Sequence, residues 1–89
     1  MAKRRTSNPK AVKGLEINPV TDGYVVHDAD RARIHYLNPT GAVILELCNG
    51  KTTEREISEL LQLAYELSEP PSAEVQECLS NLRREGLIG

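Results

Sequence analysis

The chain has 89 residues, of which 39% are hydrophobic and 27% are charged, and its formal net charge at pH 7 is -2. This length holds one domain with one small core, and the composition excludes a wholly disordered protein. No apolar run approaches the roughly 18 residues of a membrane span, and the slightly acidic balance gives no general attraction to nucleic acid phosphates.

The first residues are polar and basic and lack any periodic apolar pattern. We therefore expect a mobile arm over residues 1–13, followed by a domain over residues 14–89. Lys3, Arg4 and Arg5 could contact an acidic partner, although a solvated tail is the simpler interpretation. No apolar stretch follows them, so this is not a secretory signal, and we expect a soluble, cytoplasmic protein.

Three short extended runs come next, at residues 15–18, 24–28 and 33–37. They are separated by turn residues and contain β-branched and aromatic side chains, which predicts a three-stranded antiparallel sheet. Such a small sheet is not stable alone, so the following segments must cover one face. Ile34 and Tyr36 share one face of the third run, and we expect their side chains in the core.

The apolar period then changes to that of a helix. Asn38 is a good N-cap and Pro39 is favoured at the first helical position, which predicts a helix over residues 39–48. The apolar stripe of this helix consists of Val43, Ile44, Leu47 and Cys48. Asn49 and Gly50 tolerate the left-handed conformation that ends helices.

Two more helices are predicted downstream. Thr53 and Glu56 have the spacing of a capping box, and the second helix should end at Pro70. Its apolar positions are Ile57, Leu60, Leu61, Ala64 and Leu67. We expect Ser72 to cap a third helix and Gly86 to end it. The apolar positions of the third helix are Val75, Cys78, Leu79 and Leu82, and Leu87 and Ile88 close over the core.

Strands followed by helices favour an α+β domain, and we expect it to pack like a winged helix-turn-helix. Cys48 and Cys78 stand alone in apolar segments without the CxxC spacing of a zinc or redox site, so we interpret both as small buried residues.

The stretch from Tyr36 to Thr52 resembles the central motif of the PqqD family. In it a strand ends at Leu37 and Asn38, a Leu-rich helix follows, and Gly50 precedes a Thr. The tail is also similar to the family's last helix and closing segment, through Val75, Leu79, Leu82, Arg83, Gly86, Leu87 and Ile88. The resemblance extends from about Gly14 to the C-terminus. The basic arm and the longer link over residues 66–71 depart from the family's usual form.

This resemblance implies a non-catalytic peptide chaperone of natural product biosynthesis. Its guest would be the leader segment of a ribosomally synthesised precursor peptide, added as a strand beside the third run and resting against the last helix. The partner would be a peptide-modifying enzyme, often a radical S-adenosylmethionine (SAM) protein. The candidate peptide-binding residues are Arg33, Ile34, His35, Tyr36, Leu37, Cys78, Asn81, Leu82 and Arg84.

Two features of the residues themselves favour peptide binding. The third run contains no proline, so it can offer every N–H as a docking edge. Basic residues such as Arg84 could meet an acidic leader. Arg84 would equally suit a helix C-terminus. An exposed edge could also pair two copies of the chain, so homodimerisation stays open.

Other functions find less support. No nucleophile elbow, phosphate loop or HExxH motif is present, so we expect no enzyme activity and no cofactor. His27 and His35 could form a metal pair, but no further ligand with ordered spacing is evident. The serious alternative is a winged-helix nucleic-acid binder and transcriptional regulator. Glu74 and Glu77 on the last helix would face phosphates with negative charge, so we expect no nucleic acid and no membrane partner.

Overall fold

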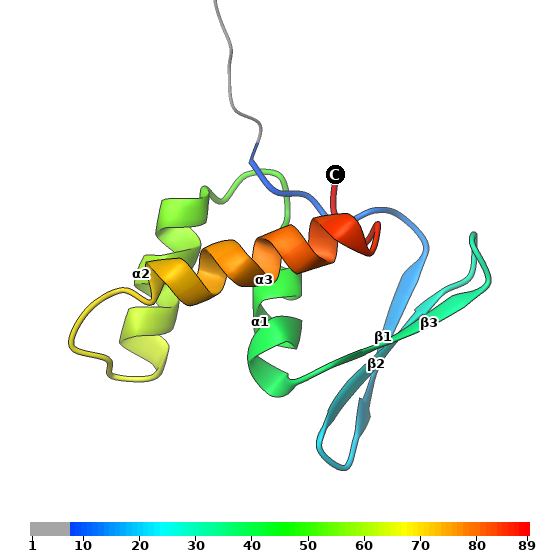
Figure 1. Ribbon diagram of the computed structural model, residues 1–89, viewed down its shortest axis with the longest axis horizontal. Coiled ribbons are helices and arrows are strands. Elements are labelled where there is room, and N and C mark those ends of the chain that lie inside the picture. Colours follow the sequence, from blue (N-terminus) through cyan, green and yellow to red (C-terminus); the bar gives the residue numbers. More distant parts are fainter. Residues whose placement is uncertain (1–7) are drawn as a thin grey trace, which may run out of the picture.

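The computed structural model describes residues 8–89 as three strands followed by three helices (Figure 1). The elements are β1 (Leu15–Val20), β2 (Gly23–Asp28), β3 (Arg33–Leu37), α1 (Pro39–Leu47), α2 (Glu54–Ala64) and α3 (Ser72–Arg84). The strands form one antiparallel sheet in the order β1-β2-β3. The α+β class and the order of elements are thus confirmed, while the likeness to a winged helix-turn-helix stays a prediction.

One face of the sheet packs on the helices. Ile17 pairs with Val26, and Val26 pairs with His35, so these side chains share the inner face. Val26 is fully buried, whereas the side chains of Ile34 and Tyr36 are 71% and 58% exposed. The prediction that Ile34 and Tyr36 belong to the core is therefore wrong, because the helices cover the opposite set of β3 residues.

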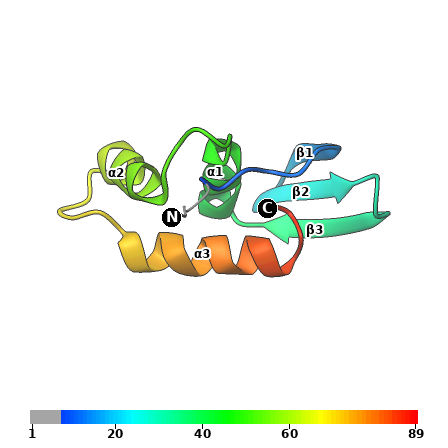
Figure 2. The same cartoon turned by 90° about the horizontal axis from the view of Figure 1, so that it is seen from above.

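α1 is the central element, and the views agree that it lies between the sheet and α2, while α3 crosses α1 and extends from α2 toward the sheet (Figures 1 and 2). The Oδ1 atom of Asn38 accepts a hydrogen bond from the N–H of Gly41 at 2.7 Å, which confirms the predicted start. The buried residues of α1 are Gly41, Ala42, Ile44 and Leu45, and Cys48 follows as a buried residue. Leu45, which the predicted stripe did not contain, is therefore buried, whereas Val43 and Leu47 of that stripe are only half-buried.

α2 begins as predicted and ends earlier. The side chain of Thr53 accepts from the N–H of Glu56 at 3.0 Å, and the carboxylate of Glu56 accepts from the N–H of Thr53 at 2.9 Å. The helix ends at Ala64, and Glu66 takes a left-handed φ of 54°. Pro70 therefore does not end α2, which has already stopped several residues before it.

α3 begins and ends in different ways. Ser72 is its first residue, and the N-cap is Pro71 without a side-chain hydrogen bond, so the prediction that Ser72 caps the helix is wrong. At the other end Gly86 has a left-handed φ of 79°. Its N–H bonds to the carbonyl of Arg83 at 3.1 Å, and the N–H of Leu87 bonds to the carbonyl of Leu82 at 2.9 Å. This pair of bonds is a Schellman motif, which turns the chain back into the core as expected.

The segment before β1 belongs to the folded domain. Pro9 accepts from the N–H of Gly50, and the N–H of Ala11 bonds to the carbonyl of Cys48 at 2.8 Å. The N–H of Val12 bonds to the carbonyl of Leu87 at 2.9 Å. The prediction of a mobile arm up to residue 13 is therefore wrong for residues 9–12. The basic Lys3, Arg4 and Arg5 lie outside the described residues.

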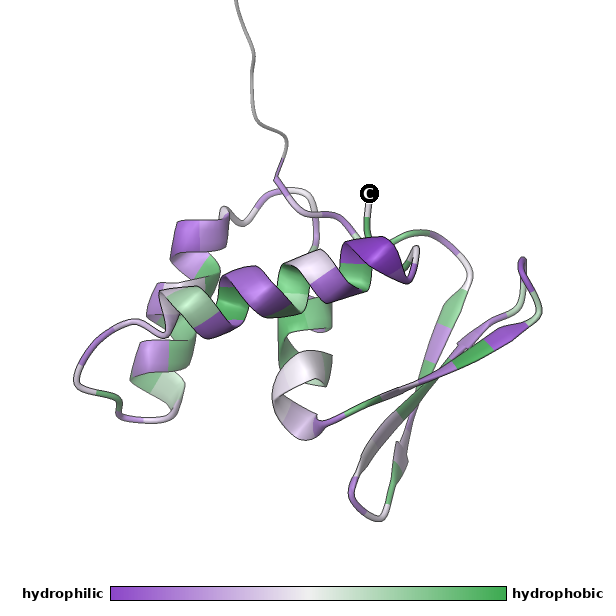
Figure 3. Cartoon of the chain, viewed as in Figure 1, coloured by the Kyte–Doolittle hydropathy of each residue, from purple (hydrophilic) through white to green (hydrophobic). Residues whose placement is uncertain are grey.

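The core is aliphatic and lies where the three helices and the inner sheet face meet. Figure 3 shows the second half of α1 as mostly hydrophobic, while α2 and α3 alternate between hydrophilic and hydrophobic positions. The buried core residues are Val26, Ile44, Leu45, Cys48, Ile57, Leu61, Val75, Leu79, Leu82, Leu87 and Ile88. Within residues 8–89, no helix combines the length and the hydrophobicity that crossing a membrane requires.

Candidate functional site

β3 forms an edge of the sheet, with β2 as its only neighbour among the described strands. A Cβ atom added to Gly23 of β2 would collide with the carbonyl oxygen of Leu37, so that carbonyl faces β2. Backbone groups alternate in direction along an antiparallel strand. The N–H and C=O groups of Ile34 and Tyr36 therefore point away from β2, toward the open side of the sheet.

A groove of about 960 Å³ borders this edge. β3 and the start of α1 form one side, α3 forms the other, and the end of α2 closes the groove at the far end from the sheet. Apolar side chains that line it include Ile44, Leu61, Val75, Leu82 and Leu87. The groove thus combines open backbone groups with an apolar floor.

Most of the predicted site residues line this groove. They are Ile34, His35, Tyr36, Leu37, Cys78, Asn81 and Leu82. Arg33 and Arg84 do not line it. The guanidinium of Arg33 donates to the carbonyl of Glu85 at 2.9 Å, and that of Arg84 donates to the side chain of Asn81 at 3.2 Å. These contacts show the proximity of the side chains, and peptide binding by these residues stays a prediction.

The lining also contains residues that the sequence did not predict for the site, and two groups of them bear on the chemistry of the groove. The first consists of Glu74 and Glu77 on α3 and Glu85 at its C-cap. Helical spacing could have found them, because Glu74 lies four positions before Cys78 and Glu85 lies four positions after Asn81. The second group consists of Tyr65, Leu67 and Pro71. These residues reach the groove because the chain reverses direction after α2. No local sequence pattern predicts this reversal.

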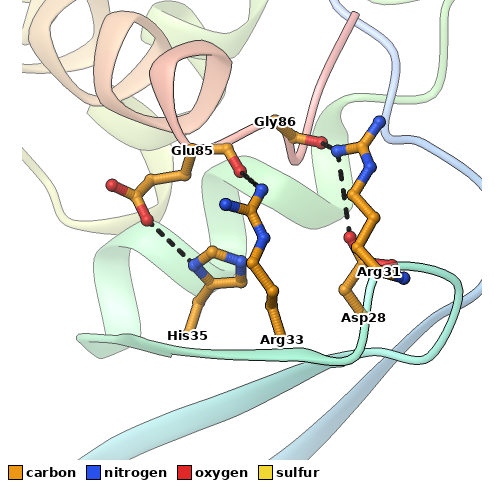
Figure 4. Close-up of polar contacts among 6 residues, drawn as sticks. All are labelled: Asp28, Arg31, Arg33, His35, Glu85 and Gly86. Atoms are coloured by element: carbon orange, nitrogen blue, oxygen red, sulfur yellow. Dashed lines mark hydrogen bonds and ion pairs between the residues drawn. The ribbon is translucent and has the colours of Figure 1, made fainter.

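Polar contacts join the start of β3 to the end of α3, and Figure 4 shows them. Arg31 donates to the carbonyl of Gly86 at 2.7 Å, Arg33 donates to that of Glu85, and the Nδ1 atom of His35 lies 2.9 Å from Oε1 of Glu85. We call these five residues the clasp. The last carbonyls of a helix have no partner within it, so the clasp satisfies that of the C-cap residue Glu85, together with that of the following Gly86, and closes one end of the groove.

His35 and Asp28 support the clasp from the inner face of the sheet. A carboxylate only accepts, so Nδ1 of His35 carries the proton that is shared with Glu85. The Nε2 atom of His35 is buried and has no hydrogen-bond partner within residues 8–89. Asp28 is 1% exposed, and its Oδ1 atom accepts from the N–H of Arg31 at 3.3 Å. This bond orients the Arg31 side of the clasp.

The part of the chain that the structure describes has no arrangement of side chains that could bind a metal ion. His27 pairs with Ile34 and His35 pairs with Val26, so the two imidazoles lie on opposite faces of the sheet. Residues 8–89 contain no group of three or more His, Cys, Asp or Glu side chains that could hold a metal ion.

The cysteines have different surroundings. Cys48 is 3% exposed and its thiol donates to the carbonyl of Ile44 at 3.1 Å. Burial, followed by the nearby Cys78, raises the pKa of Cys48 to about 11. Burial also raises the pKa of Cys78. Cys78 is only partly buried and lines the groove, so the prediction of a buried residue is confirmed for Cys48 and wrong for Cys78.

One comparison with known proteins finds a match. Residues 23–88 fit the family model described as Coenzyme PQQ synthesis protein D (PqqD). The matched range contains β2, β3 and all three helices, whereas β1 precedes it. Neither a curated protein nor a solved structure matches the chain.

Proposed function

The chain belongs to the PqqD family, and on this basis we propose that it binds the leader segment of a ribosomally synthesised precursor peptide and presents it to a modifying enzyme. The family consists of accessory, chaperone-like proteins of cofactor biosynthesis that bind a peptide and a partner enzyme and are not known as catalysts. In this proposal the chain is likewise non-catalytic, and the enzyme is a radical SAM protein.

The observation that carries the proposal is the open β3 edge beside the apolar groove. Strand addition uses the backbone groups that an edge leaves exposed, and pockets for alternate side chains provide selectivity. Ile34 and Tyr36 offer two N–H and two C=O groups. Each net hydrogen bond contributes only about 0.5–1.5 kcal/mol, so apolar side chains of the guest must provide much of the affinity.

β3 is better suited to this role than the other edge of the sheet. β1 contains Pro19, which has no N–H to donate. β3 contains no proline, and it is the strand that lines the groove together with α3. The groove side of α3 presents Glu74, Glu77 and Glu85, which disfavours the alternative of a nucleic-acid interface.

The proposal predicts a precursor peptide encoded by a neighbouring gene, and the test is to titrate that peptide into the isotope-labelled protein. We expect NMR shifts of backbone amides in β3 and along α3. Shifts confined to β1 and α2 would contradict docking at β3.

A pair of substitutions at Tyr36 separates the backbone contribution from that of the side chain. Tyr36→Pro removes an N–H that faces the open side, so we expect affinity for the peptide to fall by about tenfold or more. Tyr36→Ala keeps this N–H and removes the side chain, whose hydroxyl donates to the carbonyl of Asp22 at 2.8 Å. We expect it to bind more tightly than Tyr36→Pro. Circular dichroism must show that both variants are folded, and equal affinities of the two variants would refute strand addition.

A further inference from the structure

The charges that line the groove have one sign. Three carboxylates line it, from Glu74, Glu77 and Glu85, while no Lys or Arg of residues 8–89 does so. The one basic group in the lining is the imidazole of His35, which is already hydrogen-bonded to Glu85. An acidic guest segment would therefore meet repulsion along α3.

Within residues 8–89, the carboxylates of Glu74 and Glu77 differ from that of Glu85 in having no basic side chain hydrogen-bonded to them. Within the described residues, neither carboxylate forms an ion pair. They are three positions apart on α3, so both lie on the same side of the helix. The aromatic ring of Tyr65 and the side chain of Leu67 line the same groove and are about half exposed, at 47% and 41%.

We propose that the groove is specific for a guest segment that carries a Lys or Arg side chain next to apolar residues. The proposal deepens the proposed function and rests on it. The cation meets the carboxylates of Glu74 and Glu77, and the ring of Tyr65 offers a second favourable surface for it. The neighbouring apolar side chains of the guest cover Leu67 and the groove floor.

The geometry places this basic residue outside the part of the guest that pairs with β3. Glu85 lies at the clasp beside the start of β3, and Glu74 lies eleven positions earlier on α3. This separation is about 16 Å along a helix, which an extended peptide covers in about five residues. We therefore expect the cation several residues away from the guest residues that pair with Ile34 and Tyr36.

The experiment is a selection from a displayed library of random dodecapeptides against the full chain. We expect the selected peptides to contain more Lys and Arg than the starting library, with these residues next to an apolar pair. A selection that enriches apolar peptides without excess Lys and Arg, or with excess Asp and Glu, overturns the charge preference and leaves the proposed function intact. A selection that enriches no peptide contradicts both.

Charge variants then locate the preference. We expect the double variant Glu74→Gln with Glu77→Gln to bind the best selected peptide about three- to tenfold more weakly, because each ion pair at an exposed carboxylate contributes little alone. The control is Glu16→Gln with Glu46→Gln, which changes net charge equally at exposed positions outside the groove. Equal losses in the two double variants would overturn the assignment to Glu74 and Glu77.

Two other occupants are separate outcomes of the same measurements. If replacing Lys3, Arg4 and Arg5 by Gln tightens binding of the selected peptide, the chain's own basic residues compete for the groove and the commitment to an external guest is wrong. If the double variant Glu74→Gln with Glu77→Gln instead weakens a dimer of the chain, seen by light scattering, then a second copy is the occupant that meets these carboxylates and the proposal is equally wrong.

Discussion

Ile34, His35 and Tyr36 are adjacent in the sequence, yet they have opposite surroundings. The side chain of His35 is 9% exposed and faces α3, while Ile34 and Tyr36 point to the solvent. Alternation along a strand identifies two sets of side chains, but it does not tell which set the helices cover. The apolar character of Ile34 and Tyr36 favoured them for the core. His35 is buried in their place, and its hydrogen bond to Glu85 compensates for the burial of the imidazole.

The thiols give a prediction about reactivity. Iodoacetamide reacts with the thiolate, and both pKa values are raised, so alkylation of either cysteine should be slow at pH 8 and accelerate as the pH rises. Cys78 is partly exposed in the groove, whereas Cys48 is buried. We expect Cys78 to be alkylated at least about tenfold faster, because Cys48 requires local opening of the domain. Mass spectrometry of the cysteine-containing peptides over time measures both rates.

A bound guest should change only one of these rates. We expect it to slow the alkylation of Cys78 and to leave that of Cys48 unchanged, and Cys78→Ser isolates the rate of Cys48. Faster labelling of Cys48 than of Cys78 would contradict the placement of the two thiols.

The starts of α1 and α2 were predictable from local chemistry, whereas the cap of α3 and the end of α2 were not. Asn38 and Thr53 make the capping bonds that their sequence context indicated. The end of α2 lacks Gly or Asn, the usual residues of a left-handed cap. Glu66 adopts that conformation instead, and the N–H of Tyr65 bonds back to the carbonyl of Leu61 at 3.0 Å. The far end of the groove depends on this turn, so it could not be read from the sequence.

Thr53, the N-cap of α2, and Ser72, the first residue of α3, make a matched pair for mutation. Thr53→Ala removes the acceptor of the Glu56 N–H, and we expect the free energy of unfolding to fall by about 1 kcal/mol. Ser72→Ala removes a side chain that makes no capping bond, so we expect a change within about 0.5 kcal/mol. Urea denaturation followed by circular dichroism measures both. A larger loss for Ser72→Ala than for Thr53→Ala would contradict the observed caps.

The whole domain is held together by segments that are far apart in the sequence. Residues 9–12 lie between the end of α1 and the last residues of the chain, with hydrogen bonds to both. The sequence gives no sign of this, because the segment is short, has no periodic apolar pattern and bonds to backbone groups. The groove is likewise formed by segments that are distant in the sequence. The sequence predicted that β3 and α3 would form its sides, but it did not predict the carboxylates or the end of α2 in the lining.

This arrangement predicts that the range matched by the family model is not sufficient for folding. A fragment of residues 23–88 lacks β1 and residues 9–12, so it loses a third of the sheet strands and the half-buried Leu15 and Ile17. A two-stranded hairpin is marginal in water. We expect no cooperative urea transition for this fragment, whereas residues 8–89 should unfold like the full chain. The same midpoint for both fragments would show that β1 is dispensable.

Because the two edges of the sheet differ, guest binding should depend on the concentration of the protein. Pro19 limits pairing along β1, so β3 is the side on which the sheet can readily extend. Two chains that joined there would each mask the other's docking strand, and self-association and guest capture would exclude one another by mass action. Dilution would then strengthen the apparent affinity for the guest, and a high protein concentration would favour a dimer that cannot bind it.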